Sequence, residues 1–229
     1  MSFKELAAIR FAKQRLFPPG RVPRTIPFGP WRGIRLVLDL NGQTQYFLGL
    51  YEHEVQRWLC RFCKKSRTFI DIGAAEGYYT LFVLKKTAVP KVIAFEPLDE
   101  SRELLDRNLR LNGLSKSSRL EISTQFVGIL NEPGHCSLDS IAETVSFPCT
   151  VKMDVEGAEL EILRSASRFL KHPGSRWIIE THSLELEGKC AQLLSRAGFT
   201  VQIIKNAWWR RFIPEGRPIA HNRWLVAET

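Results

Sequence analysis

A short turn in the sequence, DIGAAEG, combines two acids with two glycines between a strand-like apolar run and a helical apolar pattern. Gly73 and Gly77 let the backbone approach a ligand closely, and a helix that begins near Glu76 points amide donors at it. Dinucleotide-binding turns read GxGxxG and hold a pyrophosphate at the helix N-terminus. Here the middle glycine is replaced, and Asp71 and Glu76 would repel a phosphate. The turn therefore suits a cationic ligand.

S-adenosylmethionine is a ligand of this kind, because it carries a sulfonium and an ammonium group and has no phosphate. Another acid, Glu96, ends the segment VIAFEP, 25 positions after Asp71. An acid at this place accepts hydrogen bonds from the ribose hydroxyls of nucleotide cofactors, NAD included. The two acids without the additional glycine favour S-adenosylmethionine over NAD. The alternative to ligand binding is a structural role, in which Asp71 caps a helix and Glu96 is an acid in the first turn of a helix.

Ionisable residues also gather at the ends of two later strands. In VKMDVEGAELEIL, Lys152 and Asp154 lie on one side of a strand by its period of two, and Glu156 follows the strand. The next strand ends IIETHS, which puts Glu180 and His182 on one face and, with the usual sheet order, beside Asp154. A single histidine is more often structural, but a histidine next to two acids at a strand end favours acid–base catalysis. The structural alternative is a lysine–aspartate ion pair with Glu156 as a helix cap.

Alternating strand-like and helix-like segments must position these residues. The alternation predicts parallel strands joined by crossover helices. Asp99 is expected to cap a helix, and Gly113 and Gly198 to end two others. The expected strands are 67–72, 91–95, 150–155, 176–180, 199–204 and 222–228. The expected helices are 51–65, 76–86, 99–112, 157–170 and 185–197.

The first fifty residues differ from the rest in composition. Residues 18–30 hold five prolines and two glycines, which exclude regular helix and predict a linker or a draped arm. Before them, apolar residues at helical spacing among basic ones fit a helix that packs on its own domain or lies at a membrane surface. After them, β-rich runs flank Asn41-Gly42, which predicts a β-hairpin with a type I′ turn. We expect an extension of helix, arm and hairpin over residues 1–50 and one methyl-donor-binding domain over residues 51–229.

The chain of 229 residues carries 33 basic and 24 acidic side chains, a net charge of +9. This balance favours an anionic partner or serves solubility alone. No apolar run approaches the roughly 20 residues that span a bilayer, and the first residues lack the apolar core of a secretory signal. We therefore expect a cytoplasmic protein, with peripheral membrane contact through its basic N-terminus. Five scattered cysteines are typical of reduced thiols, and the pair Cys60 and Cys63 favours packing over zinc binding.

On these residues the sequence resembles the FkbM-type S-adenosylmethionine-dependent methyltransferases, over about residues 46–204. The matching stretches follow the family's order, and KMDVEGAE is the most specific of them. They are FIDIGAAEGYYTL, AFEP with the later NLRLNG, SLDSI, VKMDVEGAELEILRSA and IIETHS. The resemblance implies an α/β, Rossmann-like class I methyltransferase fold: a mostly parallel seven-stranded sheet with helices on both faces.

The resemblance also implies a set of site residues. The cofactor S-adenosylmethionine would be bound by Asp71, Gly73, Ala74, Gly77, Tyr78, Glu96, Pro97 and Asp154. The reaction centre would be bordered by Lys152, Asp154, Glu156, Glu180 and His182. Between Leu120 and Leu138 the chain is shorter than is usual in the family, and no acid follows the third strand to hold the adenine. The residues left to replace it are Ser123, Thr124 or Gln125.

Members of the family largely methylate hydroxyl oxygens of sugars or natural products, so we expect a small-molecule or glycan hydroxyl as substrate. A base must act near the oxygen, and His182 or Asp154 can serve, with Lys152 steadying the charge. We assign no metal ligand from the sequence. In a variant of this mechanism, Asp154, Glu180 and His182 gather a divalent ion that polarises the hydroxyl.

Two other functions stay open at this point. The net charge and the stretch WWRR at 208–211 suit RNA, although DVEG stands where amino-group methylases of bases carry an Asn-Pro-Pro-aromatic signature. Nucleic acid is therefore the less favoured partner. The shortened middle region instead fits a catalytically silent scaffold that only binds the cofactor. The tail at 206–224 is expected to form a lid or a substrate-binding loop.

Overall fold

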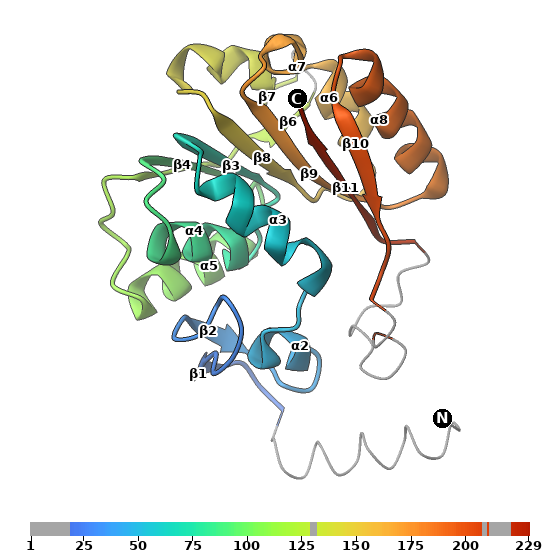
Figure 1. The fold of residues 1–229 in the computed structure, drawn as a ribbon. Helices are drawn as coiled ribbons and strands as arrows, with labels where there is room; N and C mark the ends of the chain where they lie inside the picture. Colours follow the sequence, from blue (N-terminus) through green and yellow to red (C-terminus); the bar gives the residue numbers. More distant parts are fainter. Residues whose placement is uncertain (1–18, 129–131, 208–209, 211–220) are drawn as a thin grey trace.

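The structure is a computed structural model that describes residues 19–128, 132–207, 210 and 221–229 (Figure 1). The predicted N-terminal helix, most of the predicted lid and three of the four residues in WWRR lie outside this part of the chain. No helix among the described residues is both long and apolar enough to cross a bilayer.

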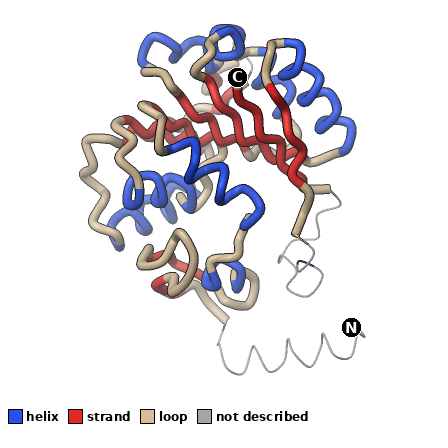
Figure 2. Tube along the Cα trace, viewed as in Figure 1, coloured by secondary structure: helices blue, strands red, loops and turns tan. Residues whose placement is uncertain are grey.

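A seven-stranded sheet forms the centre of the molecule (Figure 2). Its order is β10-β11-β9-β8-β3-β4-β5, and all neighbours pair in parallel except β11, which is antiparallel to both of its neighbours. The strands are β3 (Thr68–Ile72), β4 (Lys91–Phe95), β5 (Leu120–Ser123), β8 (Cys149–Met153), β9 (Ser175–Thr181), β10 (Thr200–Ile204) and β11 (Arg223–Glu228). This topology confirms the predicted fold class.

Helices cover both faces of the sheet and enclose two separate apolar cores (Figure 1). On one face lie α3 (His53–Cys63), α4 (Tyr78–Lys86) and α5 (Asp99–Leu111). On the other lie η1 (Leu138–Thr144), α6 (Glu159–Arg164), α7 (Ser167–Lys171) and α8 (Leu184–Arg196). Successive strand residues alternate between the cores, because strand side chains point to opposite faces in turn: Phe69 is in the first core and Ile70 in the second.

The alternation decides which polar side chains share a face. Phe69 and Ile178 belong to the core of α3, α4 and α5. Asp71 and Glu180, two positions further along the same strands, therefore point to that same face, as does Lys152, the register partner of both Asp71 and Ile178. Three buried ionisable groups thus lie on one side of three adjacent strands.

Besides offsets of one or two residues at other helix ends, the structure differs from two predictions about helices. The helix expected at 157–170 is divided into α6 and α7, because Asp139 of η1 accepts hydrogen bonds from the Arg168 amide and the Ser167 hydroxyl and so starts a new helix. Asp99 is the first residue of α5 rather than its cap, which is Leu98. Gly113 and Gly198 have positive φ just after α5 and α8, as predicted.

The predicted hairpin around Asn41-Gly42 is wrong. Neither residue has the positive φ that a type I′ turn requires. Instead, the Asp39 side chain accepts a hydrogen bond from the Asn41 amide, and the Asp39 carbonyl accepts one from the Gln43 amide. This turn leads the chain into helix α2 (Thr44–Leu48). The strand β2 (Arg35–Leu38) pairs with β1 (Val22–Thr25), which comes from the Pro-rich arm.

The segment that follows the arm packs closely on the rest of the molecule. The Trp31 ring stacks on Tyr78 with centroids 4.4 Å apart, and its Nε1 donates to the Tyr78 carbonyl at 2.9 Å. The Val37 amide donates to Asn108 on α5 at 2.8 Å. Because Trp31 and β2 belong to the same apolar core as α3 and α4, the described part of residues 1–50 is continuous with the larger domain.

Candidate active site

A cavity of about 800 Å³ opens at the carboxyl ends of β3, β4 and β8. This volume is within the usual range of small-molecule sites. The charged residues that line it, within the described part of the chain, are five acids and one arginine: Asp39, Glu76, Glu96, Asp154, Glu156 and Arg21. Such a lining attracts a cationic ligand and repels a pyrophosphate.

The DIGAAEG turn forms one wall of the cavity through Gly73, Ala75 and Glu76. Gly73 has a φ of 74°, and a Cβ there would lie 2.0 Å from the Asp154 carbonyl oxygen, so only glycine lets the ends of β3 and β8 approach this closely. Ala75 has a φ of 45°, which is costly for a residue with a Cβ. Its amide donates to Glu96 Oε2 at 2.7 Å, which holds the strained turn in place.

Gly77 serves packing rather than the cavity. Its φ is 86°, and a Cβ there would lie 2.3 Å from Leu105 Cδ1. This glycine allows α4 to pack on α5, and it does not line the cavity.

Glu96 lies at the cavity wall, where the sequence predicts a ribose-binding acid. Its Oε2 accepts from the Ala75 amide, and its Oε1 accepts from the Leu98 amide at 3.0 Å. Each carboxylate oxygen can accept more than one hydrogen bond. The two amides therefore fix the orientation of Glu96 and leave acceptor capacity for a ligand.

Asp71, predicted to contact the ligand, is fully buried and does not line the cavity. Its Oδ2 accepts from the Thr80 hydroxyl at 2.7 Å, and its Oδ1 lies 3.4 Å from Lys152 Nζ. Burial raises the pKa of Asp71, and the ammonium of Lys152 opposes this rise. Asp71 is placed to act on the site through Lys152.

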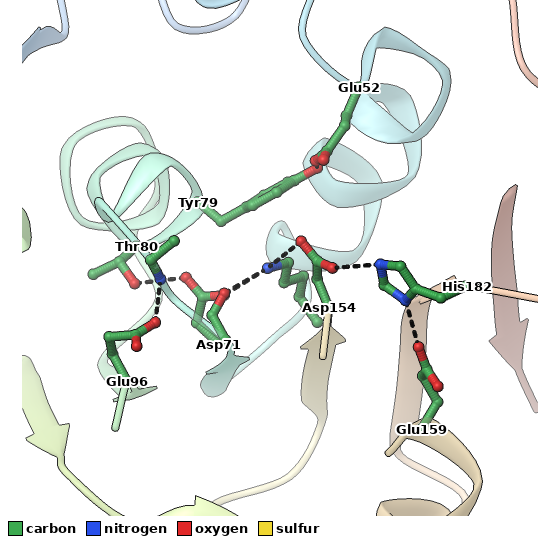
Figure 3. A network of polar contacts seen from close by, with 11 residues as sticks. Glu52, Asp71, Tyr79, Thr80, Glu96, Asp154, Glu159 and His182 are labelled. Atoms are coloured by element: carbon green, nitrogen blue, oxygen red, sulfur yellow. Dashed lines mark hydrogen bonds and ion pairs between the residues drawn. The ribbon is translucent and has the colours of Figure 1, made fainter. Parts of the chain in front are cut away.

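Lys152 is the centre of a chain of polar contacts that runs from Thr80 to Glu159 (Figure 3). Its Nζ donates to the Gly73 carbonyl at 3.0 Å and lies 3.9 Å from Asp154 Oδ2. Burial works against the ammonium charge, but the surrounding carboxylates outweigh it and raise the pKa of Lys152. Lys152 is therefore a fixed cation that joins the turn after β3 to the end of β8.

His182 follows β9 and is held from both sides (Figure 3). Its Nδ1 lies 2.5 Å from Glu159 Oε1, and its Nε2 lies 3.5 Å from Asp154 Oδ1. Partial burial lowers the pKa of His182, but the Glu159 hydrogen bond and Asp154 outweigh it, so the pKa is raised. With Nδ1 bound to Glu159, Nε2 is the nitrogen that faces Asp154; Asp154 lines the cavity, whereas His182 itself does not.

Two further acids lie buried beside this chain. Glu180 is 2% exposed, and its Oε2 has no hydrogen-bond partner among the described residues. Burial and the nearby carboxylates of Asp154 and Glu52 raise the pKa of Glu180 to about 11. Glu52 accepts a hydrogen bond from the Tyr79 hydroxyl, and burial with repulsion from Asp154 raises its pKa to about 8.

The other predicted site residues divide into two groups. Pro97 and Glu156 line the cavity, whereas Ala74 and Tyr78 do not. Of the three residues proposed for the adenine, Gln125 lines the cavity. Its neighbour Phe126 also lines the cavity and has an exposed ring. Phe126 is the first residue of the short strand β6 (Phe126–Val127), which pairs with β7 (His135–Cys136).

Sequence reasoning missed Glu159, Glu52, Tyr46 and Tyr51. Glu159 carried a usable signal, because it shares the buried helix face of Ile162 and Leu163, where an acid needs a partner. Glu52 carried no such signal, because its place beside Tyr79 depends on how α3 packs on α4. Tyr46 and Tyr51 line the cavity with rings stacked 3.8 Å apart.

The residues present fit S-adenosylmethionine. Glu96 is an acceptor for ribose hydroxyls, apolar walls such as Phe95, Leu98 and Phe126 can contact a base, and the carboxylate-rich lining suits a sulfonium and an ammonium group.

Residues 110–206 of the sequence match the model of the Methyltransferase FkbM domain. Over these residues, the match agrees with the resemblance to FkbM-type methyltransferases. It includes the segment from Lys152 to His182, whereas the DIGAAEG turn and Glu96 precede it. No curated protein matches the sequence.

Solved structures of methyltransferases share the fold. A methyltransferase FkbM from Methylobacillus flagellatus KT has a TM-score of 0.57 at 18% identity, over 72% of this chain and 44% of that one. The chain thus spans less than half of that protein. A SAM-dependent O-methyltransferase from Thermotoga maritima has a TM-score of 0.54 at 16% identity, over 84% and 72% of the two chains. A putative rRNA methylase from Clostridium thermocellum has a TM-score of 0.52 at 13% identity, over 78% of this chain and 94% of that one.

Proposed function

We propose that this chain is an S-adenosylmethionine-dependent O-methyltransferase whose substrate is a hydroxyl of a sugar, a glycolipid or another natural product. The cavity carries the proposal, because it joins a cation-attracting lining and the amide-held Glu96 to the charged end of β8. When bound, the cofactor supplies a methyl group on a positively charged sulfur.

Glu96 and the turn would hold the cofactor, and Asp154 marks the reaction centre. Asp154 lines the cavity and is the link between Lys152 and His182. An alcohol must lose its proton as its oxygen is methylated, so this centre must stabilise the oxygen as negative charge develops. The fixed cation Lys152 keeps Asp154 in place, while Glu159 keeps the His182 ring in place.

The lining also favours a neutral acceptor over RNA. Five carboxylates against one guanidinium would repel a phosphate backbone that entered the cavity. The stacked Tyr46 and Tyr51 rings instead offer an aromatic wall of the kind that packs against sugar rings.

The experiment is a transfer assay with methyl-labelled S-adenosylmethionine and three acceptor pools: hydroxylated glycans, lipid-linked sugars, and total RNA. We expect label in a carbohydrate or lipid pool, and its loss in the Asp154→Asn variant. Label only in RNA would replace the proposed substrate class. Cofactor binding without transfer to any pool would favour a cofactor-binding scaffold.

A further inference from the structure

We infer that Asp154, Glu180 and His182 together bind one divalent cation of the Mg²⁺ or Mn²⁺ class. The site itself is argued from the geometry of this chain, and only its catalytic use rests on the proposed function. The three side chains come from the ends of β8 and β9, and each offers one ligand atom within 4.8 Å of the others.

The spacing of the ligand atoms suits an ion. Two ligands about 2.1 Å from one ion lie roughly 3 Å apart in neighbouring positions and about 4.2 Å apart in opposite positions. The His182 Nε2 to Asp154 Oδ1 distance is 3.5 Å, within this range. The three ligand atoms lie within 4.8 Å of one another. Small side-chain movements would therefore bring all three into contact with one ion.

An independent observation is the unpartnered oxygen of Glu180. Glu180 is 2% exposed, so water does not compensate for the missing hydrogen bond of its Oε2. A buried carboxylate oxygen without a partner is costly, and nearby carboxylates add repulsion. The charge of Lys152 offsets part of this repulsion. Its Nζ gives Oε2 no hydrogen bond, because it is engaged by the Gly73 carbonyl, Asp71 and the other oxygen of Asp154. A cation between Glu180 and Asp154 would satisfy both.

The surroundings of His182 are those of a metal ligand. A metal-bound histidine almost always donates its second ring N–H to a carboxylate, which fixes the tautomer and the ring plane. Glu159 takes this place, with Oε1 2.5 Å from Nδ1, and it is fully buried (Figure 3). Nε2 is thereby turned toward Asp154 and left to bind an ion.

The donor set indicates the kind of ion. Carboxylate oxygens suit Mg²⁺ and Mn²⁺, and imidazole is better accepted by Mn²⁺ than by Mg²⁺. Three protein ligands leave positions for water or a substrate oxygen, and Asp154 reaches the cavity. In the proposed function, the ion would stabilise negative charge on the acceptor hydroxyl oxygen.

The test is calorimetric titration of the chelator-treated 229-residue chain with MnCl₂. We expect one ion per chain, and a loss of at least about tenfold in affinity for Glu180→Gln and for His182→Ala. Glu159→Gln, which touches no ion, should weaken Mn²⁺ binding by roughly 10- to 100-fold. The matched control is Glu185→Gln, on the exposed start of α8, which should bind Mn²⁺ as the wild type does.

Two measurements keep this test decisive. Thermal unfolding of each ion-free variant verifies that it is folded, and titration with S-adenosylhomocysteine verifies the cofactor site. Absence of Mn²⁺ binding by the folded wild type, or Mn²⁺ binding that survives both Glu180→Gln and His182→Ala, overturns the ion site. Cofactor binding that persists in that case leaves the proposed function intact.

Discussion

His182 Nδ1 lies 2.5 Å from Glu159 Oε1, between the end of β9 and the first turn of α6. This contact joins the end of β9 to the first turn of α6 and fixes which imidazole nitrogen faces Asp154. It also gives a buried acid, Glu159, a role in a site where the sequence draws attention to its exposed neighbour Glu156.

Glu159→Gln should lower the pKa of His182 and the rate of methyl transfer. The carboxylate hydrogen bond is a main reason that this pKa is raised, so a neutral amide stabilises the imidazolium less. We expect roughly a tenfold loss in kcat or more, with cofactor affinity unchanged. NMR titration of His182 in the ion-free protein measures the pKa. Glu161→Gln, on the exposed side of the same helix, is the control, and an unshifted His182 in Glu159→Gln would refute the role of this contact.

Glu96→Gln should weaken cofactor binding without unfolding the protein. The amide keeps an acceptor for one of the two backbone N–H groups but loses the charge. A lost hydrogen bond to a charged group costs about 1.5–3 kcal/mol, or roughly 10- to 150-fold in affinity for S-adenosylhomocysteine. Calorimetry measures this change against Glu100→Gln, an exposed acid in the first turn of α5. Equal affinity in the two variants would remove Glu96 from the cofactor site.

Gly73→Ala should destabilise the fold and impair cofactor binding together. The new Cβ would lie 2.0 Å from the Asp154 carbonyl at a φ of 74°, so the ends of β3 and β8 must separate. We expect a loss of about 2–4 kcal/mol in the free energy of unfolding. Gly188→Ala is the opposite case, because its new Cβ meets open space in the exposed middle of α8. This variant should gain about 0.5–1 kcal/mol in the free energy of unfolding. Urea unfolding of both variants decides whether the close approach matters, and a neutral Gly73→Ala would show that it does not.

Glu52→Gln should make the protein more stable at alkaline pH. The pKa of Glu52 is about 8 in the folded protein against 4.5 in the unfolded reference, so the folded state binds more protons between these values and its stability falls as pH rises. The stabilising contribution is complete below about pH 4.5 and lost above about pH 8. Gln stays neutral and keeps an acceptor for Tyr79. The melting temperature of the variant should therefore exceed that of the wild type by an amount that grows between about pH 4.5 and pH 8 and then levels off, at roughly 2–4 °C per kcal/mol. A constant difference across this range would contradict the raised pKa.

The sequence predicts the sheet well because periodicity and end residues are local signals. The alternation of strands and helices, and the shared face of Lys152 and Asp154, follow from the period of two in a strand. The hairpin at Asn41-Gly42 failed because two local signals competed there. Asp39 captures the amide of Asn41, and the helix that follows is stabilised by the packing of Tyr46 on Tyr51 and Tyr78.

The site is harder to predict from the sequence than the sheet, because acids with similar positions in the sequence differ in whether they reach the cavity or are buried away from it. Asp71 lies in β3 and Glu96 directly follows the neighbouring strand β4, yet only Glu96 lines the cavity. Asp71 instead pairs with Lys152, its register partner on β8, and this pairing depends on which strands are neighbours. The place of Glu52 depends on how α3 packs on α4, which no local pattern encodes.

Titration of the purified chain with S-adenosylhomocysteine, and in parallel with NAD⁺, measures the central claim most directly. We predict saturable binding of one S-adenosylhomocysteine per chain, weakened at least about tenfold by Glu96→Gln, and no binding of NAD⁺. Binding of NAD⁺, or of neither ligand, would contradict a cavity built for a cationic methyl donor.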